Sequence, residues 1–339
     1  MKKILILLSI IFLLSGCYDY TEIDDISIVS GIILDYMDNK YELTIELLNN
    51  EKESKTVVYK TSCKEIETCI LEISNESNKE IFISHQKALI LTDRTVNKDV
   101  DFYDYFLRNS KSKMNYYVYY ISDEYKDLLF KDNKDNVSFY LKDIIDYNTK
   151  DYSSLIKLSF IDMIQKISEK GIINIYPNII VKDDKVIIDS LIAFNDTNKV
   201  ILNNNESIFY NIISNNTNLT SINVPCEKGS FSLNINRSKS NYEYNNNLEI
   251  NIKEKAKLSN YNCNYDLNDD KTINKLENLA NNYLKEQTNN IIKLSQNNNI
   301  DFLGLERYIY KHNKKEIDLS KIKVEINTNI RITSIGESR

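Results

Sequence analysis

The chain contains 339 residues, with 43 basic and 49 acidic side chains and a formal net charge of −6. This acidic balance argues against a nucleic-acid partner, and the ordinary apolar content argues against intrinsic disorder. The length exceeds what one hydrophobic core usually serves, which predicts two or three domains.

The N-terminus has the pattern of a bacterial lipoprotein export signal. Lys2 and Lys3 precede an apolar run that is shorter than the roughly 20 residues of a membrane-spanning helix. The run ends in the lipobox Leu14-Ser15-Gly16-Cys17, in which the first mature cysteine receives a diacylglyceryl group. We therefore expect residues 1–16 to be a signal peptide and Cys17 to carry the lipid that anchors the protein to a membrane. The alternative is an ordinary secretory signal followed by a chance cysteine.

The first segments of the mature chain predict a β-hairpin and a helix. Residues 26–34 form a β-branched apolar run, and residues 41–47 alternate apolar with polar side chains after a polar turn, which is typical of paired strands. Residues 63–69 then have the pattern of a helix start, with Ser62 as its N-cap and acidic residues in its first turn.

Four cysteines besides Cys17 are available for disulfides on the exported face of the membrane. On a helix, Cys63 and Cys69 would lie roughly 9 Å apart along the axis, which is too far for a disulfide. We therefore expect these two cysteines to remain unpaired with each other. Cys226 and Cys263 have two open interpretations, a disulfide across a sheet or buried free thiols.

Helices and strands then alternate along the chain. The patterns predict a strand over 81–91, a short helix over 101–107, a strand over 114–121, a helix that begins at Ser153 or Ser154 and ends at Gly171, and a hairpin of 172–181 with 186–194. Interleaving of this kind indicates layered α/β or α+β architecture.

The polar, Asn-rich segment 195–205 predicts a domain boundary. We expect an N-terminal α/β domain over 17–198 and a C-terminal α+β domain over 199–339, with a further division near residue 266 left open. The second domain is predicted to contain strands near 230–235 and 248–258, a long amphipathic helix over 272–294, and a closing strand over 322–332. The predicted fold class is thus a multi-domain α+β protein in which a long helix precedes a C-terminal strand.

No residue pattern indicates catalysis. His85 and His312 are the only histidines, and neither lies in a metal-binding spacing. Nucleophile elbows, Walker loops and dinucleotide fingerprints do not occur. The sequence therefore predicts a non-enzymatic protein with no catalytic, metal-binding or cofactor-binding residues, which excludes a cell-envelope enzyme.

Four stretches together resemble the Ger(x)C family, the lipoprotein C subunits of spore nutrient germinant receptors. They run in the family's order along almost the whole mature chain: Gly16-Cys17-Tyr18-Asp19-Tyr20-Thr21-Glu22 followed by the apolar segment from Gly31 to Asp35; Phe82-Ile83-Ser84-His85; Asp104-Tyr105-Phe106-Leu107-Arg108-Asn109; and Asp301-Phe302-Leu303-Gly304 after the long helix. The chain departs from the family's pattern at Tyr18, where tryptophan is usual, and at Asn109, where aspartate is usual.

The resemblance implies a lipid-anchored subunit on the outer face of the spore inner membrane, partnered by a polytopic A subunit and a transporter-like B subunit. It implies lipidation of Cys17 and no catalytic residue. For Asp19, Glu22, His85 and Asp301, two roles remain open: stabilising a helix or strand end, or contacting a partner. The alternative function is a small-ligand lipoprotein such as a solute-binding protein, which needs a polar cleft between two similar lobes. Whether the subunit binds a small molecule directly is left open.

Overall fold

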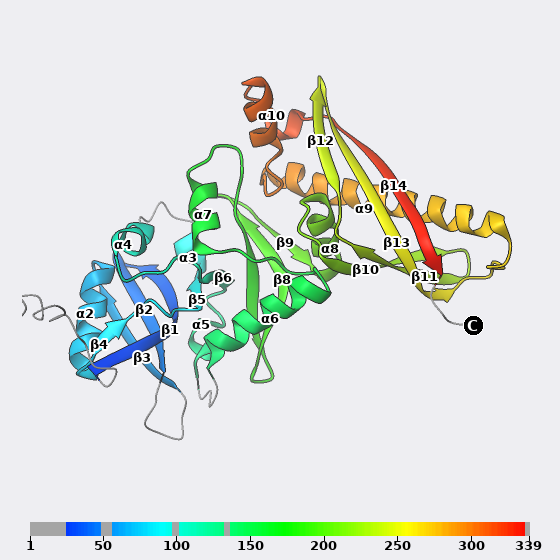
Figure 1. Cartoon of the computed structure of the whole chain (residues 1–339). Helices are drawn as coiled ribbons and strands as arrows, with labels where there is room; N and C mark the ends of the chain where they lie inside the picture. Colours follow the sequence, from blue (N-terminus) through cyan, green and yellow to red (C-terminus); the bar gives the residue numbers. More distant parts are fainter. Residues whose placement is uncertain (1–24, 49–55, 97–101, 132–135, 336–339) are drawn as a thin grey trace, which may run out of the picture.

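The computed structural model describes residues 25–48, 56–96, 102–131 and 136–335. These residues form an elongated molecule with a nine-stranded sheet toward one end and a five-stranded sheet toward the other (Figure 1). The helices are α2 (Ile66–Ser77), α3 (Asp93–Val96), α4 (Phe102–Arg108), α5 (Lys126–Leu129), α6 (Val137–Asp151), α7 (Phe160–Ile167), α8 (Asn204–Ile213), α9 (Asp270–Asn298) and α10 (Leu305–Asn313), with a 3₁₀ turn at Leu319–Lys321. None of the helices in these ranges is long and apolar enough to span a bilayer.

The first sheet mixes parallel and antiparallel pairs in the order β3-β2-β1-β5-β6-β7-β8-β9, with β4 paired to β1. Its strands are β1 (Ile26–Met37), β2 (Lys40–Leu48), β3 (Thr56–Cys63), β4 (Glu80–Phe82), β5 (Ala88–Leu91), β6 (Tyr117–Ile121), β7 (Ile175–Lys182), β8 (Lys185–Phe194) and β9 (Lys199–Asn203). Strand β1 is buried continuously from Val29 to Asp35, as expected for a central strand covered on both faces.

Both predicted hairpins of this sheet are confirmed. Strands β1 and β2 join through Asp38 and Asn39, and strands β7 and β8 through Asp183 and Asp184. All four turn residues have positive φ, which matches the right-handed twist of two-residue hairpins and suits Asp and Asn.

Three predicted elements differ in extent from the structure. The single strand expected over 81–91 is two strands, because β4 pairs with the beginning of β1 and β5 with a later part of it. The strand expected from residue 114 begins at Tyr117. The helix expected from Ser153 begins only at Phe160, where Ser159 and Asp162 form a capping box. The buried side chains of Leu155, Ile156 and Leu158 precede it outside any helix.

Helix α6 is an element that the sequence patterns above did not predict. Asn136 caps it by accepting a hydrogen bond from the Phe139 amide at 2.8 Å. Val137, Leu141 and Ile145 lie four residues apart and are buried, which is the spacing of one helix face. The signal was therefore present in the sequence.

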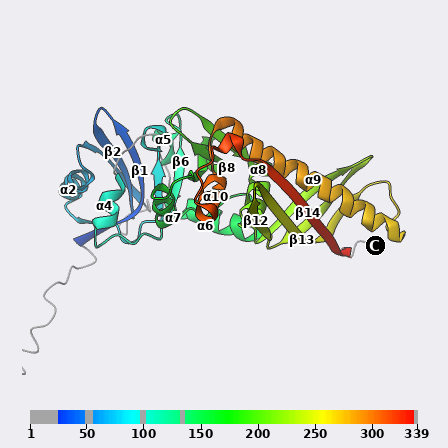
Figure 2. The same ribbon diagram turned by 90° about the horizontal axis from the view of Figure 1, so that it is seen from above.

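The second sheet has the order β10-β11-β13-β12, with β14 parallel to β13. Its strands are β10 (Leu219–Cys226), β11 (Gly229–Asn236), β12 (Ser240–Asn245), β13 (Asn247–Asn262) and β14 (Val324–Ile335). The long helix and the C-terminal strand are confirmed as α9 and β14, which lie side by side (Figures 1 and 2). Ile322, Ile326 and Ile330 are buried, and Glu325, Asn327, Asn329 and Arg331 between them are exposed, which is the alternation of a half-buried strand.

The predicted division of the chain into domains remains a prediction. Strand β9 pairs with β8, so the first sheet continues to Asn203, inside the segment 195–205. The second sheet begins at Leu219.

Candidate functional site

The predicted anchor, Cys17, lies outside the described residues, as do Asp19 and Glu22. The first described residue, Asp25, is eight positions after Cys17 and can be at most about 29 Å from it in an extended chain. The beginning of β1 is therefore the described part of the fold that follows the predicted lipid most closely in sequence.

Gly31 of the first family motif permits a close approach of α6 to β1. A Cβ atom on Gly31 would lie 1.9 Å from the Ser138 hydroxyl oxygen, so any larger residue would displace the start of α6. The buried carboxylate of Glu46, opposite Gly31 on β2, accepts hydrogen bonds from the amides of Val137 and Ser138 at 2.8 and 3.1 Å. An acidic group is favourable at a helix N-terminus, so this part of the motif positions α6.

Asp35, the other end of that motif, forms a buried ion-pair cluster. Its carboxylate accepts hydrogen bonds from Thr92 at 2.6 Å and from Arg94 Nε at 3.0 Å, and it pairs with Lys126. Burial raises the pKa of Asp35, but the hydrogen bonds from Arg94, Lys126 and Thr92 outweigh burial and hold the pKa well below its usual value. The cluster joins β1 to the segments that follow β5 and β6.

The second family motif meets the segment that follows the third motif, beside the beginning of β1. Glu80 of β4 pairs with Ile26 of β1 and forms an ion pair with Lys111, which follows α4. The Ser84 hydroxyl donates a hydrogen bond to the Lys111 carbonyl oxygen. His85 is exposed in the turn after β4, and its ring lies 5.7 Å from that of Phe82. These motifs therefore lie beside the part of β1 that follows the predicted anchor in sequence.

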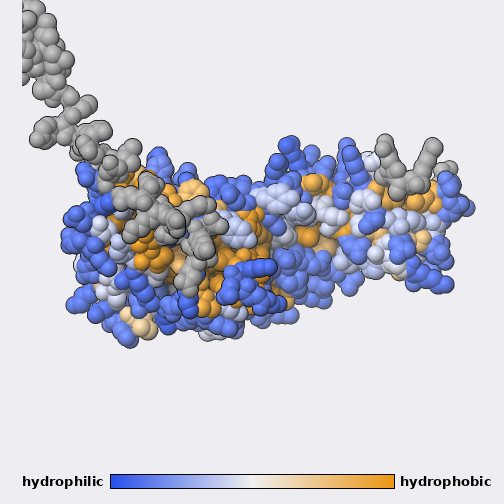
Figure 3. Space-filling view, turned by 90° about the horizontal axis from the view of Figure 1, so that it is seen from below, coloured by the Kyte–Doolittle hydropathy of each residue, from blue (hydrophilic) through white to orange (hydrophobic). Residues whose placement is uncertain are grey.

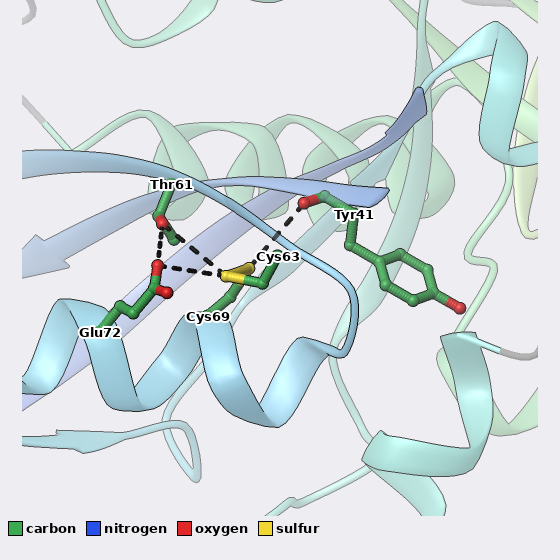
Figure 4. Close-up of a disulfide and its surroundings, with 5 residues drawn as sticks. All are labelled: Tyr41, Thr61, Cys63, Cys69 and Glu72. Carbon is green, nitrogen blue, oxygen red and sulfur yellow. Dashed lines mark hydrogen bonds between the residues drawn. A yellow bond between two sulfur atoms is a disulfide. The ribbon is translucent and has the colours of Figure 1, made fainter. Parts of the chain in front are cut away.

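The prediction that Cys63 and Cys69 do not pair is wrong, because the structure places them in a disulfide with a Cα–Cα distance of 5.5 Å. Cys63 is the last residue of β3, and α2 begins only at Ile66, so helical spacing does not separate the two cysteines. Figure 4 shows Glu72 beside the disulfide, where its carboxylate accepts a hydrogen bond from Thr61 at 2.6 Å. The disulfide fastens the edge strand β3 to α2.

The second pair of cysteines, left open above, is also a disulfide. Cys226 at the end of β10 and Cys263 after β13 have a Cα–Cα distance of 6.1 Å. The bond connects the two segments on either side of β11, which pairs with both strands.

Asp301 of the fourth motif stabilises the start of α10 at the joint of the molecule. Here the half that contains the first sheet meets the half that contains the second sheet. The Asp301 carboxylate accepts hydrogen bonds from the amides of Leu305 and Glu306 at 3.0 and 2.8 Å, and its carbonyl oxygen accepts one from Ile173 at 2.9 Å. Burial raises the pKa of Asp301 to about 6, although the backbone amides oppose this. These contacts favour the structural role of Asp301.

Gly171 makes a further contact with α10 at this joint. Its carbonyl oxygen accepts a hydrogen bond from the Arg307 amide at 3.1 Å, and a Cβ on Gly171 would lie 2.9 Å from the Arg307 nitrogen. The expected helix terminator at Gly171 is thus a contact point for α10, and its φ of +74° suits glycine.

The described residues contain no group of three or more His, Cys, Asp or Glu side chains that could hold a metal ion. His312, at the end of α10, has its Nδ1 2.8 Å from the Tyr308 carbonyl oxygen. The motif residues that the structure describes thus make contacts within the fold, and the two histidines lie apart.

Comparison with known proteins identifies the family. Residues 19–181 match the family described as spore germination protein N-terminal domain, and residues 189–336 match the family described as spore germination B3/GerAC like, C-terminal. No curated protein sequence matches the chain. The fold is similar to the crystal structure of the GerBC protein, with a TM-score of 0.59 and 15% sequence identity over 89% of this chain and 97% of that one. Because the two matches cover nearly all of the chain in the expected order, the protein belongs to the GerAC-like spore germination family.

Proposed function

We propose that this protein is the lipid-anchored, non-enzymatic C subunit of a spore nutrient germinant receptor. The observation that carries the proposal is the position of the two family matches, which occupy nearly all of the chain directly behind the lipobox cysteine Cys17. The partners are the polytopic A subunit and the transporter-like B subunit in the spore inner membrane.

The lipid on Cys17 explains physically how the subunit assembles with its membrane partners. Each buried CH₂ of an acyl chain contributes about 0.8 kcal/mol, so two or more chains hold a folded domain at a membrane stably. Confinement beside membrane partners raises the effective concentration of the subunit, so that a weak interface keeps the complex together. The subunit on this proposal acts as a scaffold.

The surface of the N-terminal half offers apolar contacts for such partners. Figure 3 shows hydrophobic residues gathered over this half, whereas the other half is mainly hydrophilic from the same side. Exposed large apolar side chains on the first sheet and its helices include Val57, Val58, Leu128 and Phe139, each at least 37% exposed. Apolar surface of this kind is typical of protein interaction sites.

The anchor is tested by replacing Cys17 with alanine. Cys17→Ala is expected to shift the protein from the membrane to the soluble fraction, whereas the neighbouring Tyr18→Phe should leave it membrane-bound. Fractionation and detergent partitioning measure the shift. Membrane-bound Cys17→Ala protein would show that something other than the lipid holds it.

The receptor role is tested in spores. Spores without the protein should respond poorly to the nutrients of its receptor and still germinate by routes that bypass receptors. Pull-down of detergent-solubilised protein should recover the A and B subunits. Normal nutrient germination of the deletion strain, with no related C subunit to substitute, would instead favour the small-ligand lipoprotein.

A further inference from the structure

A cavity of about 340 Å³ lies at the joint between the two halves of the molecule. Its wall comes from the segment before α7, from α7, from α8 and from α10, which are far apart in sequence. Ile156, Leu158 and Tyr210 form an apolar part of this wall. The size suits a small organic molecule rather than a macromolecule.

The charged side chains around this cavity are three cations and two carboxylates. Lys157 pairs with Asp146 at 2.6 Å, outside the cavity wall. Asp162 forms the capping box of α7 with Ser159. The remaining carboxylate, Glu169, pairs with Arg307 and, at 3.5 Å, with Lys311. Both carboxylates of the cavity therefore already have partners.

Lys166 is the cation of this cavity that has no ion-pair partner among the described residues. Across the described part of the chain, no carboxylate forms an ion pair with its ammonium group, although Asp162 lies close enough to act electrostatically. Burial lowers the pKa of Lys166, the negative charge of Asp162 opposes this shift, and the positive charge of Arg307 adds to it. A partly buried cation without an ion-pair partner is only partly compensated by a more distant carboxylate, so an anion beside it would be stabilising.

Arg307, which also lines this cavity, has a donor without an acceptor in the described structure. Its terminal nitrogen pairs with Glu169, but its buried Nε–H has no hydrogen-bond acceptor among the residues that the structure describes. An orphaned guanidinium donor is unusual, because buried polar groups are normally satisfied. Within the described ranges, Lys166 of α7 thus has no ion-pair partner and Arg307 of α10 has one donor without an acceptor, and both residues line the same cavity.

We propose that this cavity binds the oxyanion of a small molecule, a carboxylate or a phosphate, between Lys166 and Arg307. The anion accepts hydrogen bonds from the Lys166 ammonium group and from the Arg307 Nε–H. The apolar wall at Ile156 and Leu158 then contacts the remainder of the molecule. Because the two donors come from α7 and α10, the bound anion fastens the joint between the two halves. This site does not depend on the proposed receptor role.

Thermal unfolding of the full-length protein in detergent tests the site. Phosphate and acetate serve as the two probes, and chloride at equal ionic strength is the reference. We expect at least one probe to raise the unfolding midpoint by a few degrees over chloride, because a ligand that binds only the folded state stabilises it. Stabilisation by phosphate alone assigns a phosphate group, and stabilisation by acetate alone assigns a carboxylate.

Matched variants separate specific binding from general salt effects. Lys166→Met and Arg307→Lys should lose the excess stabilisation, whereas Lys170→Met, at an exposed lysine outside the cavity wall, should keep it. Lys166→Met should also unfold at a higher temperature than the wild type in chloride, because the only partly compensated charge is gone.

A measurement on the wild type covers the case in which a variant fails to fold. The effective probe should protect Lys166, and not Lys170, from acetylation as read by mass spectrometry. Excess stabilisation that survives in Lys166→Met, or neither probe exceeding chloride together with unprotected Lys166, would overturn the proposal.

Discussion

Three buried acidic side chains show how residue surroundings decide what a carboxylate does. Asp35 is paired with two cations, and Glu46 accepts hydrogen bonds from the start of α6. Glu254 differs from both, because it is 3% exposed on the apolar face of β13 and one of its carboxylate oxygens has no partner. Asp35 stabilises the fold in its charged form and Glu46 holds the start of α6 through hydrogen bonds, whereas Glu254 is costly when charged.

Glu254→Gln is predicted to stabilise the protein at alkaline pH. Burial raises the pKa of Glu254 to about 7 from its usual 4.5, although the hydrogen bond from the Lys239 amide opposes this. The folded state therefore holds a proton that the unfolded state has lost, so stability falls as pH rises from about 4.5 to 7. The variant should gain about 1–3 kcal/mol at pH 8.

Chemical denaturation at pH 4 and pH 8 measures this effect. The gain should be small at pH 4, where Glu254 is protonated in both states. Glu249→Gln, on the same strand and less buried, is the matched control. An equal gain at both pH values would show that the charge of Glu254 is not the cause.

At the scale of elements, α9 protects the edge of the second sheet. Among the strands that the structure describes, β14 pairs with β13 alone, and free edge strands invite aggregation. The outward amides of Ile330 and Ile332 donate hydrogen bonds at 2.8 Å to the side chains of Asn281 and Glu277 on α9. The Thr328 hydroxyl donates one to the Asn281 carbonyl oxygen at 3.0 Å. The helix thus takes the place of a further strand.

Asn281→Ala is predicted to destabilise the protein by about 1–3 kcal/mol, because the amide of Ile330 loses its acceptor. Asn282→Ala, at the neighbouring exposed position, should change stability by less than about 0.5 kcal/mol. Urea denaturation measures both values, and light scattering should show faster aggregation for Asn281→Ala alone. Equal stability of the two variants would mean that α9 does not satisfy this edge.

At the scale of the whole molecule, the two halves are joined by several polar contacts. Asn211 of α8 donates hydrogen bonds to the carbonyl oxygens of Ser153 and Leu155, and Asn195 donates to that of Asn299. Together with the Gly171 contact to α10, these bonds connect segments about 55 to 135 residues apart in sequence. The joint therefore depends on the fold of both halves.

Gly171→Ala is predicted to loosen this joint. The added Cβ would meet the backbone nitrogen of Arg307 at 2.9 Å, and alanine is strained at a φ of +74°. We expect a loss of about 1–3 kcal/mol and faster limited proteolysis between α7 and β7. The adjacent Lys170→Ala is the control, and an unchanged cleavage pattern in Gly171→Ala would contradict the role of this contact.

Local patterns in the sequence determined the hairpins, the long helix and the closing strand. Alternation of apolar and polar side chains marks a half-buried strand, and helical spacing over more than twenty residues marks α9, because both periodicities follow from backbone geometry alone. Motifs spread over the chain in a fixed order also identified the family, since a sequence carries this order without its tertiary structure.

Contacts between distant segments were decided only by the tertiary structure. The hydrogen bonding of β3 with β2 carries that strand through to Cys63, so the helix begins later than its local signals indicated and the two cysteines meet. In the same way, the segment 81–91 forms two strands, because β4 pairs with the beginning of β1 and β5 pairs with a later part of it. Lys166 and Arg307 meet at one cavity only because α10 returns to α7. Local periodicity cannot encode these outcomes, because each depends on packing against residues far away in the sequence.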